Sequence, residues 1–211
     1  MIISIASLKG GCGCSSLLVL LAHHLSISGK TVYLIELSLP GSLDLLYCRS
    51  KLLEEQLPFE FFRSDMQKAS LLIDRLNEQD HMLLIDIPKT FSDRNLQVIL
   101  EKVDRFIIPF QYDLISLHAA SGFSLLINKF SLNSKSIFLP NRNGDTHFDE
   151  ELQSRQEMLR SLGALSAPIP LIVPLINLRS MQLPPACLFE LAPSLQLLCN
   201  QYLFNPLTDK P

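Results

Sequence analysis

Short, almost wholly apolar runs alternate along the chain with longer segments in which apolar residues recur at helical spacing. The runs HMLLID (His81–Asp86) and RFIIPF (Arg105–Phe110) are typical of strands buried on both faces of a parallel sheet. Further strands are predicted at Ile2–Ser7, Thr31–Glu36, Ser136–Leu139 and Ile169–Val173. Helices are predicted at Ser15–Ser28, which Gly29 ends, and at Met66–Glu78, Asp93–Val103, Leu114–Phe130, Asp149–Leu162 and Leu188–Leu203.

This order of elements predicts the fold. Strands that alternate with helices of about ten or more residues form βαβ crossovers, so we expect an α/β fold with a doubly wound, mostly parallel sheet and helices on both faces. No repeat or Gly/Ser-rich linker interrupts the pattern, and residues 1–211 are expected to form a single domain. The longest loops are predicted at Pro58–Ser64 and Arg142–His147, and the phenylalanines of the first loop are expected to pack on the core.

Composition narrows the class of protein. With 47% hydrophobic and 18% charged residues the chain is expected to be ordered over most of its length. The net charge of -3 gives no electrostatic footprint for nucleic acid, and no apolar run approaches the ~20 residues that span a bilayer. The five cysteines are irregularly spaced and no export signal precedes them, so we expect reduced thiols in a cytoplasmic protein.

The first predicted strand leads through a glycine-rich turn, SLKGGCGCSS (residues 7–16), into the first predicted helix. Gly10, Gly11 and Gly13 allow backbone conformations in which N–H groups converge on an anion. The start of the following helix adds free donors and a partial positive charge. A hydroxyl at Ser15 is placed to bind Mg²⁺. A turn that merely joins a strand to a helix is the alternative interpretation.

Two carboxylates follow the strands that neighbour this turn. Glu36 and Asp86 each end a predicted strand, and the carboxyl ends of parallel strands line the ligand crevice of a doubly wound sheet. Asp86 is interpreted as part of a Mg²⁺ site. For Glu36, a catalytic role and a solvated charge at a strand end are both open.

The turn resembles the deviant Walker A loop of the ParA/MinD family of P-loop ATPases, whose pattern is KGGxGK[ST]. Lys9 matches the signature lysine, which in that family reaches the nucleotide of a partner subunit, and Cys14 replaces the second lysine. The resemblance implies that ATP or ADP with Mg²⁺ is bound by Lys9, Gly10, Gly11, Cys12, Gly13, Cys14, Ser15 and Ser16, that Ser15 and Asp86 hold the metal, and that Lys9 and Glu36 are the catalytic residues.

Later segments follow the family in order. TVYLIELSLPGSLDLL is similar to its second strand and switch I, where two aspartates are replaced here by Glu36 and Ser38. HMLLIDIPKTFSD is similar to Walker B and switch II, and SIFLPNRN to the strand whose asparagine, here Asn141, faces adenine. IPLIVPLINLRSMQ and LAPSLQLLCNQYLF are similar to the last strand and terminal helix.

The thiol at Cys14 determines how much of this function is expected to survive. An ammonium among phosphates contributes charge-assisted contacts worth about 1.5–3 kcal/mol each, so its loss weakens binding, and turnover more than binding. The pair Cys12 and Cys14 has two interpretations, a metal or redox site and two small side chains in a tight turn. We favour the second, because no other thiol pair stands at ligand spacing.

Three functions are therefore considered. The first is a degenerate ParA/MinD-like switch, a homodimer that positions a plasmid, chromosome or cell-pole machine and hydrolyses ATP slowly or not at all. The second is a pseudo-ATPase scaffold that dimerises and recruits protein partners without a nucleotide cycle, and the third an unrelated P-loop kinase or ligase. Non-specific DNA binding through Arg155, Arg160 and Arg179 is possible, a protein partner is favoured, and FNPLTDKP at residues 204–211 is not a basic amphipathic membrane anchor.

Overall fold

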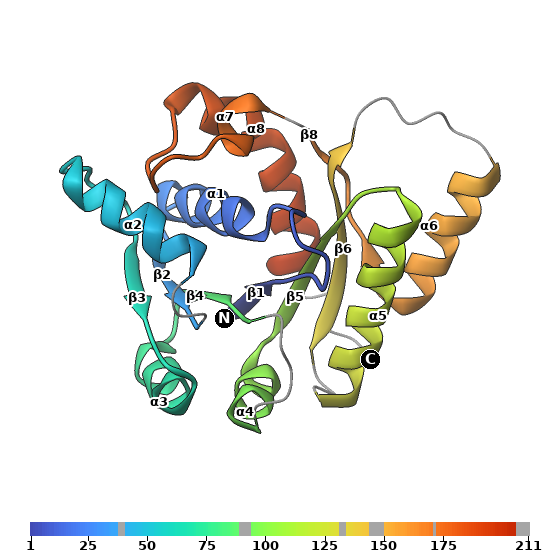
Figure 1. Cartoon of the computed structure of the whole chain (residues 1–211), viewed down its shortest axis with the longest axis horizontal. Coiled ribbons are helices and arrows are strands. Elements are labelled where there is room, and N and C mark those ends of the chain that lie inside the picture. The colour runs from blue at the N-terminus through green and yellow to red at the C-terminus, as the bar shows by residue number, and fades with distance from the viewer. Residues whose placement is uncertain (38–40, 89–93, 131–133, 144–149, 171, 206–211) are drawn as a thin grey trace.

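Among the residues that the structure describes, one eight-stranded sheet forms the centre of the molecule, and all of its strand pairs are parallel (Figure 1). The computed structural model describes residues 1–37, 41–88, 94–130, 134–143, 150–170 and 172–205. The strands are β1 (Ile2–Ile5), β2 (Thr31–Glu36), β3 (Glu60–Arg63), β4 (His81–Asp86), β5 (Arg105–Phe110), β6 (Lys135–Asn143), β7 (Ala164–Leu165) and β8 (Ile169–Pro170). Their order is β3-β2-β4-β1-β5-β6-β7, with β8 paired to β6. The expected parallel α/β fold is confirmed.

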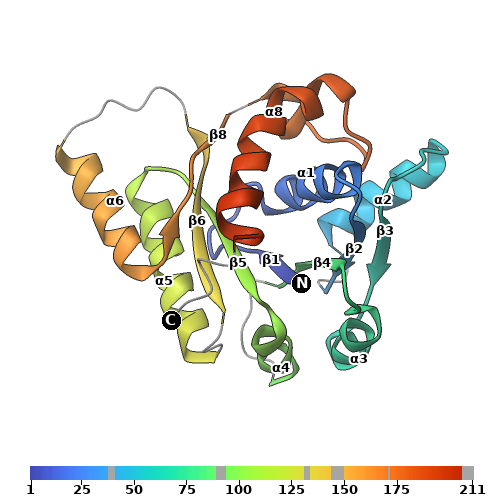
Figure 2. The same ribbon diagram turned by 180° about the vertical axis from the view of Figure 1, so that it is seen from behind.

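Helices cover both faces of this sheet (Figures 1 and 2). They are α1 (Cys14–Ile27), α2 (Ser42–Leu52), α3 (Met66–Leu76), α4 (Arg94–Lys102), α5 (Leu114–Phe130), α6 (Glu150–Leu162), α7 (Val173–Ile176) and α8 (Pro185–Leu198). Helices α1 and α8 share one buried apolar cluster with the sheet, and α3, α4 and α5 share the cluster on the opposite face. None of the helices in the described residues has both the length and the apolar content needed to cross a membrane.

The sheet brings the expected site residues to one edge. In the register of β2 and β4, Glu36 stands opposite Asp86, and both residues are the last of their strands. Strand β1 lies between β4 and β5, so the turn that follows it leaves the sheet at the same edge, beside Asp86. Parallel strands place their carboxyl ends together, and a ligand crevice at that edge follows from the topology.

The prediction of a loop at Pro58–Ser64 is wrong in part, because Glu60–Arg63 forms strand β3 at the edge of the sheet. Its side chains alternate between the two faces: Phe61 packs against the cluster of α1, and Phe62 against the opposite one. Phe59 is buried as well, at 7% exposure, so the expectation that these phenylalanines pack on the core is confirmed. A four-residue strand with charged ends has too short an alternation to be distinguished from a loop.

Differences are also found in the C-terminal half. The strand predicted at Ile169–Val173 is only Ile169–Pro170, and Val173 begins helix α7. Arg142 and Asn143, predicted as loop, continue strand β6, while residues 144–147 of that prediction lie outside the described residues. The terminal helix begins earlier than predicted, because a proline is well suited to a first helical position, and it continues after α8 as a wider π-type turn, η1 (Cys199–Leu203).

Candidate functional site

The turn between β1 and α1 has the backbone geometry of an anion-binding loop. Gly11 and Gly13 have φ angles of 80° and 87°, in the left-handed region that favours glycine. Gly13 is the N-cap of α1, it offers no side chain to the helix, and the first turn of α1 contains no acidic residue. The N-terminal end of α1 therefore carries the positive end of the helix dipole with no carboxylate in its first turn, which favours an anion there.

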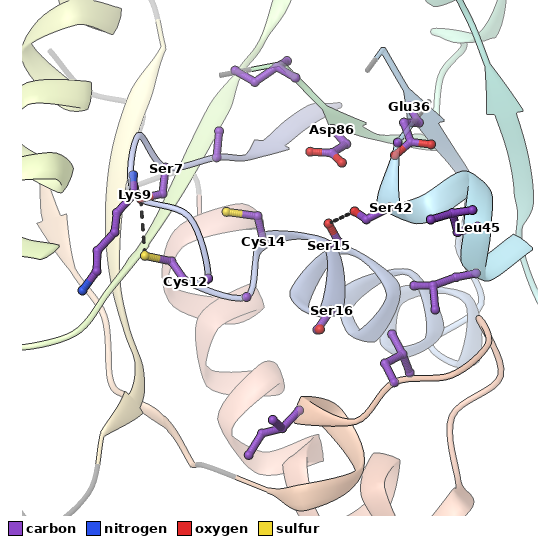
Figure 3. A pocket seen from close by; sticks show the side chains of 18 residues that line it. Ser7, Lys9, Cys12, Cys14, Ser15, Ser16, Glu36, Ser42, Leu45 and Asp86 are labelled. Carbon is purple, nitrogen blue, oxygen red and sulfur yellow. Dashed lines mark hydrogen bonds between the residues drawn. The ribbon is translucent and has the colours of Figure 1, made fainter. Parts of the chain in front are cut away.

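An open pocket of about 720 Å³ lies at this helix start (Figure 3). The loop lines it with Lys9 and with residues 11 to 16, together with Glu36, Asp86 and the beginning of α2. The expected loop residues Gly11, Cys12, Gly13, Cys14, Ser15 and Ser16 all belong to this lining, and Gly10 lies exposed in the turn beside it. The volume falls within the roughly 300–1,000 Å³ of small-molecule sites, so the turn is neither collapsed nor filled by its own side chains.

Lys9 makes an ion pair within its own chain. Its Nζ lies 2.9 Å and 3.1 Å from the two carboxylate oxygens of Asp113, just before α5. Figure 3 shows the Lys9 side chain extending away from Ser15 and Asp86. The Lys9 side chain is 28% exposed and that of Asp113 43%, so water screens the pair, and an exposed pair of this kind contributes at most about 1 kcal/mol. Asp113 is thus a partner of the loop that no local pattern in the sequence marks.

The two cysteines of the loop have different surroundings. Cys12 is 3% exposed, and its sulfur lies 3.6 Å from the hydroxyl of Ser7, which donates to it, and 3.9 Å from that of Ser116. Cys14 is half-buried, is the first residue of α1 and lines the pocket. In the described residues no group of three or more His, Cys, Asp or Glu is arranged to hold a metal. The two contacts of Cys12 agree with a small side chain packed in a tight turn.

Oxygen atoms suited to Mg²⁺ meet in the pocket. Ser15, at the start of α1, and Asp86, at the end of β4, both line it. The Ser15 hydroxyl lies 2.6 Å from the hydroxyl of Ser42, the first residue of α2 (Figure 3). Hydroxyl and carboxylate oxygens are ligands that Mg²⁺ accepts together with phosphate oxygens and water, so these two residues fit the metal that the resemblance implies.

Glu36 connects β2 to the beginning of α2. Its side chain is fully buried, and its two oxygens accept hydrogen bonds from the backbone N–H groups of Leu43 at 2.9 Å and Asp44 at 2.7 Å. Burial raises the pKa of the Glu36 carboxyl, and the two N–H donors partly oppose that rise. The structure thus gives Glu36 a capping role for α2 that the sequence did not indicate. Its catalytic role stays a prediction, and Ser38 lies outside the described residues.

Asn141 holds the loop. Its side-chain Nδ2 donates to the carbonyl oxygen of Cys12 at 2.7 Å, and the residue is 3% exposed. It is absent from the described lining of the 720 Å³ pocket and borders a separate hollow of about 10 Å³. The resemblance implied that Asn141 faces adenine, which stays a prediction, and the sequence gave no sign of this bond, which joins residues far apart in the chain.

A parallel sheet with a glycine loop and a helix start at the carboxyl end of its first strand is the architecture of P-loop nucleotide-binding proteins. No model of a known protein family matches the sequence, and no curated protein matches it. Among solved structures, the fold is that of the ParA/MinD ATPases.

Three solved structures illustrate the similarity of this chain to that fold. The septum site-determining protein MinD of Pyrococcus horikoshii, complexed with Mg-ADP, has a TM-score of 0.70 at 18% identity over 96% of both chains. A ParA family ATPase of Chlorobium tepidum has a TM-score of 0.67 at 19% identity over 93% of both chains. A plasmid partition protein of Borrelia burgdorferi bound to AMPPNP has a TM-score of 0.67 at 17% identity, over 95% of this chain and 98% of that one.

Proposed function

We propose that the protein is a nucleotide-dependent switch of the ParA/MinD type that binds ATP or ADP with Mg²⁺ and hydrolyses ATP slowly or not at all. Its proposed role is to position a cargo, such as a plasmid, a chromosome or a machine at the cell pole. The observation that carries this proposal is the glycine loop, which keeps its left-handed residues and opens onto a pocket large enough for a nucleotide. Structures of the same fold that hold Mg-ADP and AMPPNP support it.

In this proposal, backbone groups bind the phosphates. The N–H groups between Gly11 and Ser16 and the positive end of α1 attract a polyanion without any charged side chain. Ser15 and Asp86 would hold Mg²⁺, which neutralises phosphate charge when bound. Binding is therefore expected to survive the exchange of lysine for Cys14.

Hydrolysis is expected to be more affected than binding. Phosphoryl transfer needs positive charge most strongly in the transition state, and Cys14 supplies none. Lys9, the nearest cation of the loop, is engaged by Asp113. The carboxylate of Glu36 accepts hydrogen bonds from two backbone N–H groups of α2. In this arrangement it stabilises the start of the helix and does not position a water molecule for hydrolysis.

A second candidate is a dimerising scaffold without a nucleotide cycle, which Cys14 and the Lys9–Asp113 pair favour. Both candidates include a homodimer and protein partners. Leu114 and Ile115, at the start of α5 directly after Asp113, are 60% and 71% exposed. Exposed apolar side chains beside the loop are suited to contact with protein rather than with DNA. Nucleotide binding separates the two candidates.

Replacing Gly11 by alanine should reduce the affinity for Mg-ATP by at least about tenfold, because alanine disfavours a φ of 80° by about 1–2 kcal/mol and the loop would shift its N–H groups. The change adds no steric conflict, since a Cβ at Gly11 meets nothing within 4 Å. Calorimetric titration of the full chain with ATP and ADP in Mg²⁺ measures the affinity.

Gly29→Ala is the matched control. Gly29 has a φ of 82°, also with nothing within 4 Å of a Cβ, but it lies beyond the other end of α1. Both variants should lose similar thermal stability, and only Gly11→Ala should lose nucleotide affinity. If the unaltered protein binds no nucleotide at millimolar concentration, the proposal of a nucleotide-dependent switch is wrong, and the proposal of a scaffold replaces it.

Replacing Asp113 by serine should tighten Mg-ATP binding by about two- to fivefold, because a freed Lys9 can turn toward the phosphates and the pair it leaves is worth at most about 1 kcal/mol. Serine keeps an oxygen for the N–H of Ser116, which Asp113 accepts at 2.9 Å, so α5 stays capped. The double change Asp113→Ser with Lys9→Gln should lose the gain. An unchanged affinity in Asp113→Ser would show that Lys9 does not act on nucleotide within its own chain.

A further inference from the structure

Two hydroxyl groups meet where the glycine loop faces helix α2. The Oγ atom of Ser15, in the first turn of α1, lies 2.6 Å from the Oγ atom of Ser42, the first residue of α2. Both residues line the pocket of about 720 Å³ together with Asp86, the last residue of β4. Figure 3 shows the two hydroxyls directed toward each other on the side of the pocket where the Asp86 carboxylate lies. Oxygen atoms from three separate elements are thus gathered on one side of the pocket.

Ser42 is held in this place by the contacts of the two residues that follow it. The backbone N–H groups of Leu43 and Asp44 donate to the carboxylate oxygens of Glu36, at 2.9 Å and 2.7 Å. The Asp44 carboxylate also forms an ion pair with Arg63, with 3.0 Å between nitrogen and oxygen. These contacts join the start of α2 to the last residues of β2 and β3, so the Ser42 hydroxyl is oriented by the protein itself.

The separation of the two hydroxyls suits ligands of one magnesium ion. Mg²⁺ binds its oxygen ligands in octahedral geometry at about 2.0–2.1 Å, which places neighbouring ligands roughly 2.9 Å apart. The 2.6 Å between Ser15 and Ser42 is slightly shorter, and a small rotation of either side chain within its rotamer closes the difference. Ser42 is an exposed residue, so an ion that enters the open pocket can reach its hydroxyl.

We propose that Ser42 is a third protein ligand of Mg²⁺, beside Ser15 and Asp86, and that it joins the start of α2 to the metal site of the glycine loop. This inference rests on the proposed nucleotide function, in which phosphate oxygens and water supply the remaining ligands. The Ser42 hydroxyl then directs a lone pair at the metal instead of sharing a proton with Ser15.

The test measures the affinity for ATP by calorimetry, in Mg²⁺ and in EDTA, for the full chain and for Ser42→Ala. The ratio of the two affinities is the gain that the metal provides. Ser42→Ala should reduce this ratio by about three- to tenfold and leave the affinity in EDTA unchanged, because water replaces one neutral ligand only in part. Ser42→Thr, which keeps a hydroxyl, should keep the ratio. Ser28→Ala is the control, because it removes an exposed hydroxyl at the other end of α1.

Ser42→Cys distinguishes a metal ligand from a phosphate contact. A thiol binds Mg²⁺ poorly and softer ions such as Cd²⁺ well. This variant should lose the gain from Mg²⁺, and its affinity for ATP in Cd²⁺ should exceed that of the original protein by about tenfold. The original protein in Cd²⁺ accounts for the thiol of Cys14, which lines the same pocket.

The possible failures are distinct. An equal loss of ATP affinity with and without Mg²⁺ in Ser42→Ala would show that Ser42 contacts phosphate rather than metal. An unchanged ratio in this variant, or no gain from Mg²⁺ in the original protein, would show that Ser42 holds no metal. Each of these results overturns the inference and leaves nucleotide binding in place. If the original protein binds ATP in neither condition, the proposed function is wrong, and the inference fails with it.

Discussion

Replacing Cys14 by lysine should tighten Mg-ATP binding by about ten- to a hundredfold. The residue is the first of α1 and lines the pocket, so an ammonium there would lie among the phosphates. One hydrogen bond to a charged group contributes about 1.5–3 kcal/mol, and 1.4 kcal/mol corresponds to a factor of ten. The effect should be larger for ATP than for ADP, because the added charge faces the longer polyanion. Calorimetry with both nucleotides measures it.

The control for this change is Cys14→Met, which adds length without charge and should leave the affinity within about threefold of the original. ATP turnover is measured in the same variants. A gain in binding without turnover would place the block to hydrolysis at Glu36 and Lys9. If Cys14→Lys changes neither binding nor turnover, the loop no longer binds phosphate, and a single substitution does not restore that function.

Replacing Glu36 by alanine should reduce the free energy of unfolding by about 2–5 kcal/mol, because the buried N–H of Leu43 and the partly buried N–H of Asp44 lose their acceptor at about 1–3 kcal/mol each. That is a large share of the roughly 5–15 kcal/mol that stabilises a domain. Glu36→Gln keeps one acceptor oxygen and should recover about half of the loss. Chemical denaturation of the three proteins measures the difference. Equal stability in all three would contradict the capping role.

The same carboxyl predicts a pH dependence. Burial raises the pKa of Glu36 above its ordinary value of 4.5, so the folded chain favours the protonated form. Its contribution to stability is present below pH 4.5 and is lost as the pH rises through the folded-state pKa. The stability of the original protein minus that of Glu36→Gln should therefore fall with rising pH above 4.5. A difference that rises over this range would mean that the two N–H bonds outweigh burial.

The parts of the fold that could be predicted are those in which the pattern of apolar residues is set by burial on both sides. Strands β4 and β5 are apolar almost throughout because they are interior, and their predicted bounds are those of the structure. Helix α2 was not predicted, because only Leu43 and Ser50 are buried in it and its sequence has little helical periodicity. It is fixed instead by the Glu36 cap and by Ser42, which are tertiary contacts.

The residue types of the candidate site could be predicted from the sequence, but the hydrogen bonds and ion pairs among its side chains could not. The predicted loop residues apart from Gly10 line one pocket together with Asp86, as expected where parallel strands end at the same edge, and their role in nucleotide binding stays a prediction. The partners of Lys9 and Asn141 come from α5 and from the loop itself, and no local pattern in the sequence marks a contact between residues so far apart. Each of these two side chains was expected to face nucleotide, and each is engaged by the protein.

The half-buried thiol of Cys14 can react with an electrophile that enters the pocket. A lysine in its place would be protonated at neutral pH and would react poorly, whereas a thiol forms a stable thioether with an acrylamide or a chloroacetamide. Of the other four cysteines, Cys12, Cys187 and Cys199 are buried and Cys48 is exposed on α2. A phosphate-like fragment that carries a weak electrophile would thus be delivered to Cys14 in preference to the others, and covalent ligands specific for this variant of the loop become accessible.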